Sequence, residues 1–201
     1  MKTKLIRIQD CAEVQPGFSA KGAIGNEPGG TLQVITAQHL TKGEPYRYQD
    51  EHKLLIVPSR SSENYLVVPG DIIFMSRGST NYAVLLVEIP QPAIAPLTFY
   101  ILKPKSNVFP AYLAWCINQE TVKAQLNEIR TGAATPMIPR QEFGEILIPL
   151  PPLDIQRRIA KLDALQTRER TLLKQLVDEA ERLHRLAGLQ LISHLTNDKQ
   201  E

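Results

Sequence analysis

Three prolines, Pro149, Pro151 and Pro152, separate two very different parts of this chain. Before them, residues 143–150 end in an apolar run that is typical of a buried β-strand. After them, apolar residues recur at steps of three, four and seven, which predicts a long helix. Proline cannot donate a backbone hydrogen bond and it restricts the residue before it, so the strand cannot run on into the helix. The sequence therefore predicts a globular part followed by a rod.

The predicted helix spans 153–195 and would be roughly 60 Å long at 1.5 Å per residue. Asp154 is a suitable N-cap, and Gly188 is a candidate for an early end or bend. Glu169 interrupts an otherwise apolar, coiled-coil-like seam, and residues 196–201 form a polar tail. The apolar positions are Ile155, Ile159, Leu162, Leu165, Leu172, Leu173, Leu176, Ala180, Leu183, Ala187, Leu191 and Leu195. A globular part of this size cannot bury the whole stripe, so the helix needs partner helices.

Residues 1–152 are predicted to form one mixed, β-rich domain, which makes the fold class α+β. Strands are expected within 5–10, 31–40, 51–59, 64–78, 82–89, 97–104 and 144–150. Residues 109–129 carry apolar side chains at helical spacing, and residues 130–143 are expected to be a loop.

Composition and charge exclude several classes of protein. Lys and Arg outnumber Asp and Glu by only one in each part of the chain, 14 against 13 in residues 1–150 and 9 against 8 in residues 151–201. Neither part is a polybasic tail, so any contact with nucleic acid needs a local patch. We expect no membrane span and no signal peptide, because no sufficiently long apolar run is present. The only two cysteines, Cys11 and Cys116, suit a reducing cytoplasm, and Cys116 is expected to be buried.

The common catalytic signatures are missing from the sequence. It contains no Gly-x-x-x-x-Gly-Lys phosphate loop, no Gly-x-Gly-x-x-Gly after a strand, no Gly-x-Ser-x-Gly elbow and no Asn-Pro-Pro-aromatic methyltransferase motif. The four histidines have no metal-ligand spacing. We therefore expect no catalysis, no cofactor and no metal. Glu51 and Lys53 have the Glu-x-Lys form of some nucleases, which leaves a metal-dependent nuclease as a distant alternative.

Polar, glycine-bearing loops with isolated basic residues remain. Arginine, asparagine, serine and threonine are the residue types that contact bases and phosphates in DNA. Gly78 and Gly132 would let the backbone turn or approach closely. The predicted DNA contacts are Lys21, Arg47, Arg60, Arg77, Ser79, Thr80, Asn81, Arg130, Thr131 and Thr135. For Arg77 and Arg130, a salt bridge to a nearby carboxylate is an equally good interpretation.

The stretch 108–165 resembles the specificity (S) subunit of type I restriction–modification systems. The resemblance rests on the helix with Tyr112 and Leu113, the loop from Gly132 to Ile138, and the Pro-Leu-Pro-Pro-Leu run at 149–153 followed by Gln156. Upstream, "LQVITAQHL" and "VVPGDIIFMSRGS" also resemble the family. The likeness covers nearly the whole chain.

The resemblance implies a target recognition domain that reads a few base pairs of double-stranded DNA, a spacer helix, and partners in the methyltransferase (modification) and restriction subunits. It implies no catalysis by this chain. Full specificity subunits carry two recognition domains and two spacer helices, so we expect a half-subunit that forms an antiparallel homodimer and favours an inverted-repeat site. The predicted dimer interface is Leu162, Leu165, Leu172, Leu176, Leu183 and Leu186.

A second class of function stays open, that of an adaptor with the same fold that assembles partner proteins and no longer reads DNA. A recognition domain should gather its basic residues on one face, whereas scattered basic residues would favour the adaptor. The nuclease alternative requires a cluster of carboxylates beside Glu51 and Lys53.

Overall fold

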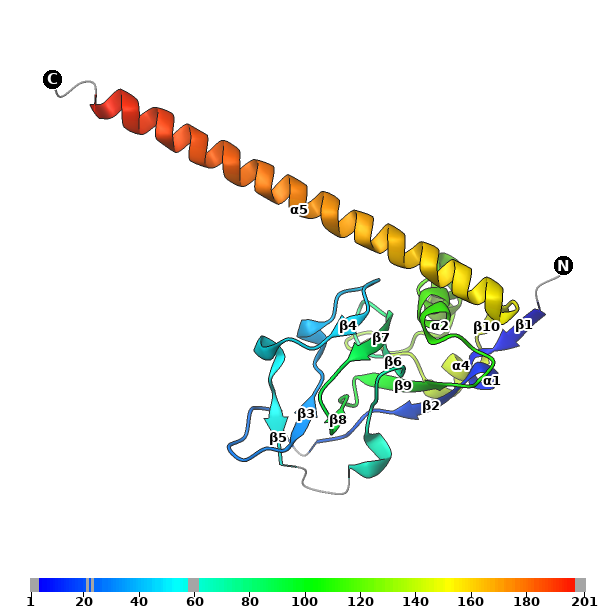
Figure 1. The fold of residues 1–201 in the computed structure, drawn as a ribbon. Coiled ribbons are helices and arrows are strands. Elements are labelled where there is room, and N and C mark those ends of the chain that lie inside the picture. The colour runs from blue at the N-terminus through cyan, green and yellow to red at the C-terminus, as the bar shows by residue number, and fades with distance from the viewer. Residues whose placement is uncertain (1–3, 21, 23, 58–61, 198–201) are drawn as a thin grey trace. The chain divides into compact units, whose positions relative to one another are not determined.

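A computed structural model describes residues 4–20, 22, 24–57 and 62–197, with residue 191 and residues 193–197 described as backbone only. The chain forms two compact units that divide after Ala160. The first unit is globular and the second consists of helix, because the helix α5 (Leu153–Asn197) begins in the first unit and makes up the second (Figure 1). The predicted α+β class is confirmed.

A five-stranded sheet forms the centre of the globular unit. Its β4–β7 pair is parallel and the other pairs are antiparallel. In spatial order its strands are β2 (Ala12–Pro16), β9 (Phe99–Pro104), β6 (Ile72–Met75), β7 (Ala83–Glu88) and β4 (Tyr46–Arg47).

Alternate residues of the central strands face opposite ways, and both faces of the sheet are buried. Ile72 and Phe74 of β6 pack into a core with the helices, whereas Ile73 between them packs into a second core. On β9, Leu102 and Ile101 divide in the same way. Successive side chains of a strand point to opposite faces of the sheet, so neighbouring residues enter different cores. Because both faces are buried, these strands are apolar at almost every position.

Two smaller sheets complete the unit. One contains β5 (Leu55–Ile56), β3 (Leu32–Val34) and β8 (Ala93–Ile94); the other pairs β1 (Lys4–Arg7) with β10 (Leu147–Leu150). Short 3-10 helices cover Ala37–His39, Asp50–His52 and Glu63–Tyr65.

The free edge of β10 is closed by a side chain. The Gln125 amide donates to the backbone oxygen of Leu147 at 3.0 Å and accepts from the backbone N–H of Leu147 at 3.0 Å. One amide therefore takes the place of a neighbouring strand at this position. The other edge of β10 pairs with β1.

The helices depart from the sequence-based prediction in two places. The predicted single helix over 109–129 is two helices, α2 (Pro110–Ile117) and α3 (Glu120–Ile129). They separate at Asn118, whose side chain accepts from the backbone N–H of Ala83 at 2.9 Å and donates to its backbone oxygen at 2.8 Å. The predicted loop over 130–143 contains the start of a short helix, α4 (Arg140–Glu145). The remaining helix, α1 (Ile8–Cys11), follows β1.

Helix α5 begins at Leu153, so Asp154 is not its N-cap. The Pro152 carbonyl accepts from the backbone N–H groups of Ile155 and Gln156, both at 3.0 Å. Asp154 lies instead in the first turn, where a carboxylate interacts favourably with the helix dipole. Gly188 neither ends nor caps the helix, which continues to Asn197.

A buried amide holds the first turns of α5 on the globular unit. Gln156 is 1% exposed. Its oxygen accepts from the backbone N–H of Phe109 at 2.7 Å, and its nitrogen donates to the carbonyls of Asn107 at 3.2 Å and Pro151 at 2.8 Å. The hydroxyl of Tyr112 donates to the carbonyl of Pro149 at 2.7 Å. Hydrogen bonds thus join three elements of the family resemblance: the Tyr112 helix, the proline-rich run and Gln156.

Candidate nucleic-acid interface

Two of the predicted DNA-contact loops lie together. The Gly78 N–H donates to the Pro136 carbonyl at 2.8 Å, and the Ile138 N–H donates to the Ser76 carbonyl at 2.8 Å. Thr131 and Met137 exchange both of their backbone hydrogen bonds at 2.9 Å. These bonds join the β6–β7 connection, residues 76–82, to the segment 130–138. We call the two segments together the loop pair.

Hydrogen bonds from two buried side chains hold the backbone of the loop pair in place. Tyr100 on β9 donates its hydroxyl proton to the Ile138 carbonyl at 2.7 Å. Ser76 is 1% exposed, and its hydroxyl donates to the Thr98 carbonyl at 2.9 Å. Burial raises the pKa of Tyr100, whereas the positive charges of Arg140 and Arg77 act in the opposite direction. Arg140 is therefore a third arginine of this region, and the sequence analysis did not single it out.

Arg130 is held by an amide and not by a carboxylate. Its Nη2 donates to Oδ1 of Asn81 at 2.8 Å, and the Asn81 amide donates to the Met75 carbonyl at 2.8 Å. Among the described residues neither Arg77 nor Arg130 forms a salt bridge. The Arg130 guanidinium is thus oriented without its charge being neutralised, and its buried Nε has no hydrogen-bond partner among the described residues.

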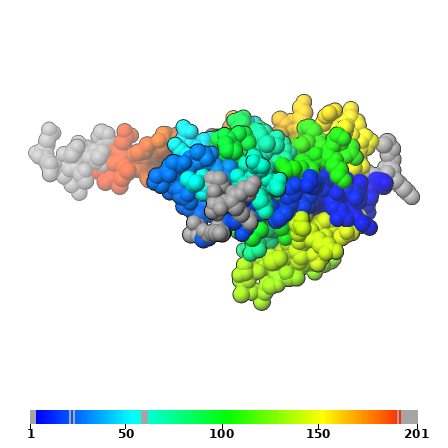
Figure 2. Space-filling model, turned by 90° about the horizontal axis from the view of Figure 1, so that it is seen from below, coloured from blue at the N-terminus to red at the C-terminus, as the bar shows by residue number. Residues whose placement is uncertain are grey.

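The exposed rim of the loop pair is polar. Arg77, Ser79, Thr80, Thr131 and Thr135 are exposed, whereas Asn81 is 8% exposed and engaged through both polar ends of its amide. In the space-filling view, the yellow-green segments of α3, residues 130–138 and α4 project from the face of the globular unit (Figure 2).

Both glycines of the loop pair have left-handed backbone conformations. Gly78 has a φ of 102° and Gly132 a φ of 84°. A Cβ at Gly132 would lie 2.7 Å from the Thr135 oxygen, so only glycine fits the tight turn there. The two glycines let the loops turn sharply, as the sequence predicted.

The remaining predicted contacts do not join the loop pair. Arg47 on β4 is ion-paired with Glu88. Glu88 ends β7, whereas the loop pair precedes β7, and six residues of strand span roughly 20 Å. Lys21 and Arg60 lie outside the described residues. The described basic residues among the predicted contacts are therefore divided between two places.

The other sites considered from sequence are the residues around Glu51 and a possible membrane span. Among the described residues, no group of three or more His, Cys, Asp or Glu side chains could hold a metal ion, so Glu51 and Lys53 lack the cluster that a nuclease requires. His52 instead stacks on His39 with ring centroids 4.3 Å apart. None of the described helices is long and apolar enough to cross a membrane.

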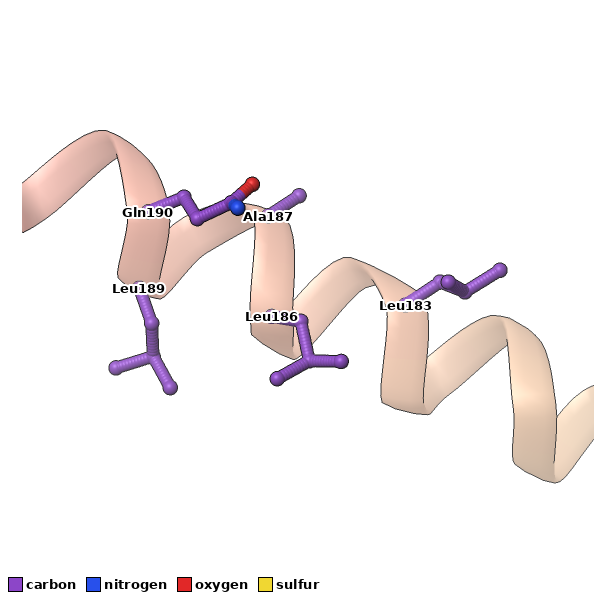
Figure 3. Close-up of a pocket in the computed structure, with 5 residues that line it drawn as sticks. All are labelled: Leu183, Leu186, Ala187, Leu189 and Gln190. Atoms are coloured by element: carbon purple, nitrogen blue, oxygen red, sulfur yellow. The ribbon is translucent and has the colours of Figure 1, made fainter.

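The second unit presents large apolar side chains to solvent. The six leucines of the predicted dimer interface are exposed, for example Leu165 at 60% and Leu176 at 67%. Leu173 and Val177, each 56% exposed, lie on the same stripe and were not in the predicted set. Figure 3 shows Leu183 and Ala187 pointing to one side of the helix, and Leu186 and Leu189 to another. The shallow hollow that these residues line belongs to a single helix.

A family model settles what kind of chain this is. The model described as the type I restriction modification DNA specificity domain matches residues 2–182. The chain belongs to this family. The specificity-domain match includes the loop pair and most of α5, so the resemblance inferred from residues 108–165 is confirmed over nearly the whole chain.

Similar proteins are longer than this specificity-domain chain. The type I restriction enzyme MjaIX specificity subunit of Methanocaldococcus jannaschii is 26% identical over 156 residues, which is 77% of this chain and 35% of that protein. The chain therefore spans about a third of the length of this curated relative.

Solved structures share the fold. A chain in a structure concerning complex assembly and conformational transition of the type I R-M system has a TM-score of 0.67 at 18% identity, with 91% of this chain and 43% of that chain covered. The HsdS subunit from Thermoanaerobacter tengcongensis has a TM-score of 0.57 at 18% identity, covering 86% of this chain and 39% of that chain. The S subunit from M. genitalium has a TM-score of 0.56 at 13% identity, covering 87% and 41%.

Proposed function

We propose that this chain is a non-catalytic DNA-reading subunit of a type I restriction–modification complex. Its globular part, residues 1–152, would read one half of a bipartite site, and the helix from residue 153 would set the distance to the other half. The observation that carries this proposal is the loop pair, in which uncompensated arginines and exposed hydroxyl groups converge on one specificity domain.

The loop pair has the chemistry of base readout. Arginine can bind a guanine edge through two hydrogen bonds, and serine or threonine can donate to or accept from either base-pair type. Arg77, Arg130, Ser79, Thr80, Thr131 and Thr135 are the proposed contacts here. Lys21, Arg47 and Arg60 are proposed as phosphate contacts, which position a protein on DNA without reading sequence. Asn81 contacts a base in this proposal only if one of its present hydrogen bonds opens.

The chemical steps would belong to other subunits. Methyl transfer needs a cofactor site, and we assign it to methyltransferase subunits that this chain recruits; cleavage would belong to a restriction subunit. The formal net charge of +2 supports this division, because phosphate contacts dominate DNA affinity and this chain alone offers few of them. Cys11 and Cys116 are buried free thiols, which suits work in a reducing cytoplasm.

The homodimer is part of the same proposal. An exposed leucine stripe on a helix of this length is unfavourable in water, and a second copy of the helix would bury it. The proposed interface consists of Leu162, Leu165, Leu172, Leu176, Leu183 and Leu186. A twofold dimer carries two identical readers and so favours an inverted repeat.

The adaptor is the second candidate, and one observation favours it. Arg47 is neutralised by Glu88 and lies apart from the loop pair, so the basic residues do not all gather on one face. An adaptor would keep the dimer and its partner subunits and would show no sequence preference on DNA.

Selection from a random DNA pool, followed by sequencing, distinguishes the two functions. The chain is tested alone and with a co-produced methyltransferase subunit. We expect enrichment of a bipartite inverted repeat, mainly with the partner. Replacing both Arg77 and Arg130 with alanine should abolish the enrichment, whereas Arg7→Ala, on the exposed strand β1, should not. A stable dimer without enrichment in either condition would favour the adaptor.

A further inference from the structure

Arg140 follows the projecting segment 130–138 of the loop pair (Figure 2). It is exposed and begins α4, two residues after Ile138. Burial raises the pKa of Tyr100, and the charges of Arg140 and Arg77 oppose this effect, so both guanidinium groups lie near the Tyr100 hydroxyl. That hydroxyl donates to the Ile138 carbonyl at 2.7 Å. Arg140 therefore belongs to the same surface as the loop pair, although it lies outside both of its segments.

A neutral oxygen holds the Arg140 side chain. Its Nη1 donates to the backbone carbonyl of Val14 at 3.3 Å, on β2, which is an edge strand of the five-stranded sheet. Among the described residues Arg140 forms no salt bridge. Arg130 is held in the same manner by the amide oxygen of Asn81 at 2.8 Å. Each guanidinium is thus oriented while its charge remains uncompensated, an arrangement that suits the binding of an anion.

A purely structural role does not explain an arginine at position 140. One hydrogen bond of 3.3 Å from an exposed side chain contributes little to stability, and the first turn of a helix favours carboxylates over cations. Of the two carboxylates on α4, Glu145 is already ion-paired with Arg7 at 3.2 Å. Glu142 is exposed and forms no salt bridge with Arg140 among the described residues. A positive charge is therefore left facing solvent beside the loop pair.

Arg140 differs in position from the side chains proposed to read bases. The exposed hydroxyl groups of the loop pair lie in the turns at Gly78 and Gly132, whereas Arg140 is held at the edge of the sheet. Side chains in exposed turns can enter a groove of DNA, whereas a side chain tied to the sheet edge meets the backbone that borders the groove. Phosphate contacts fix a protein on the duplex and carry no sequence information.

We propose that Arg140 is a phosphate anchor, which binds the DNA backbone beside the bases that the loop pair reads and adds affinity without adding sequence preference. This inference rests on the proposed DNA-reading function and deepens it, because it assigns anchoring and base reading to different arginines. Arg140 holds the domain on the duplex, and Arg130 discriminates between sequences.

The salt dependence of DNA binding tests the anchor. The full chain, co-produced with a methyltransferase subunit, is titrated by fluorescence anisotropy against a duplex selected from the random pool and against a shuffled duplex of the same composition. We expect Arg140→Ala to raise both Kd values about fivefold to tenfold at low salt and to reduce the slope of log affinity against log salt by about 1. The preference between the duplexes should stay unchanged. Arg140→Lys should retain most of the affinity and the slope, because a phosphate contact needs the charge and not the planar pair of donors.

Two neighbours on α4 provide matched controls. Glu142→Gln removes a nearby negative charge and should lower both Kd values about twofold to threefold, which is opposite in direction to Arg140→Ala. Gln141→Ala changes an exposed neutral neighbour and should leave the affinity and the slope unchanged. Urea denaturation of each variant shows whether it is folded as stably as the original chain.

Several results would overturn the anchor while the DNA-reading function stands. If Arg140→Ala weakened binding only at particular positions of the site, Arg140 would be a base reader. If the loss were equal at every salt concentration and accompanied by lower stability in urea, Arg140 would be a structural residue of α4. Unchanged binding of both duplexes would remove it from the interface. Equal binding of the two duplexes by the original chain would instead overturn the DNA-reading function, and failure to bind either duplex would overturn both.

Discussion

Arg130 illustrates how a single side chain can be prepared for binding. Asn81 orients its guanidinium through a neutral oxygen, so the charge remains available to an anion or a guanine edge. A carboxylate in the same place would have held the side chain equally well and neutralised it. The difference between the two kinds of partner decides whether the residue is structural or able to recognise DNA.

We expect Arg130→Ala to weaken selection at particular positions of the DNA half-site by about tenfold, because one base contact contributes about 1–3 kcal/mol of discrimination. Arg130→Lys should also lose discrimination, since lysine lacks the planar pair of donors. The measurement is sequencing of selected DNA in the presence of the partner subunit. Loss of affinity that is equal for all sequences would instead indicate a phosphate contact.

The two cysteines lead to a second prediction at this scale. Burial raises the pKa of Cys11 and of Cys116 to about 11 each. At pH 8 the reactive thiolate is then roughly a thousandth of each thiol, so iodoacetamide should leave the folded chain unmodified. Mass spectrometry checks this, with the urea-unfolded chain as the control that reacts at both positions. Rapid labelling of the native chain would contradict the burial.

Sequence reasoning singled out both segments of the loop pair but could not show that they lie together. Arg77 and Arg130 stood out by residue type and by the glycines beside them. The two segments are joined by the backbone hydrogen bonds from Gly78 to Pro136 and from Ile138 to Ser76. Such contacts between segments far apart in the sequence depend on the order of the strands in the sheet, which local sequence patterns do not give. Arg140 was missed because the candidates were taken from beside glycines, and Arg140 lies eight residues after Gly132.

At the scale of elements, apolar periodicity located most strands and the long helix. It failed where a single distant contact decides the structure. The period runs unbroken through Asn118, yet the helix ends there because that side chain pairs with Ala83 on β7. The N-cap of α5 was misplaced because the helix begins directly after Pro152, whose carbonyl accepts its first backbone hydrogen bonds, and a search for capping side chains does not find such a start.

Gln156 ties α5 to the globular unit, and we expect Gln156→Ala to lower the free energy of unfolding by about 2–4 kcal/mol. The substitution leaves a buried N–H and two buried carbonyls without their partner. Urea denaturation at fixed protein concentration measures the change. Gln175→Ala, at an exposed position of the same helix, is the matched control and should change stability by less than about 0.5 kcal/mol. Equal effects of both substitutions would contradict the anchoring role.

At the scale of the whole molecule, the proposed function makes the helix the element that determines how many copies of the chain act together. We expect Leu176→Asp to convert a dimer to a monomer, because it places two carboxylates in the proposed leucine interface. Ile192→Asp changes an apolar residue of similar exposure, 60% against 67%, which lies about 160° around the helix from Leu176, and should remain dimeric. Light scattering of the purified chains measures both masses. A dimeric Leu176→Asp protein would refute the assigned interface.

A chain that exposes an apolar surface for assembly must prevent unwanted association through its other surfaces. The Gln125 amide that occupies the backbone of Leu147 does this for the two-stranded sheet. An open strand edge is a template on which further chains can add, and aggregation begins at such edges. Here one amide group terminates the ladder at Leu147, on the edge of β10 that β1 does not cover.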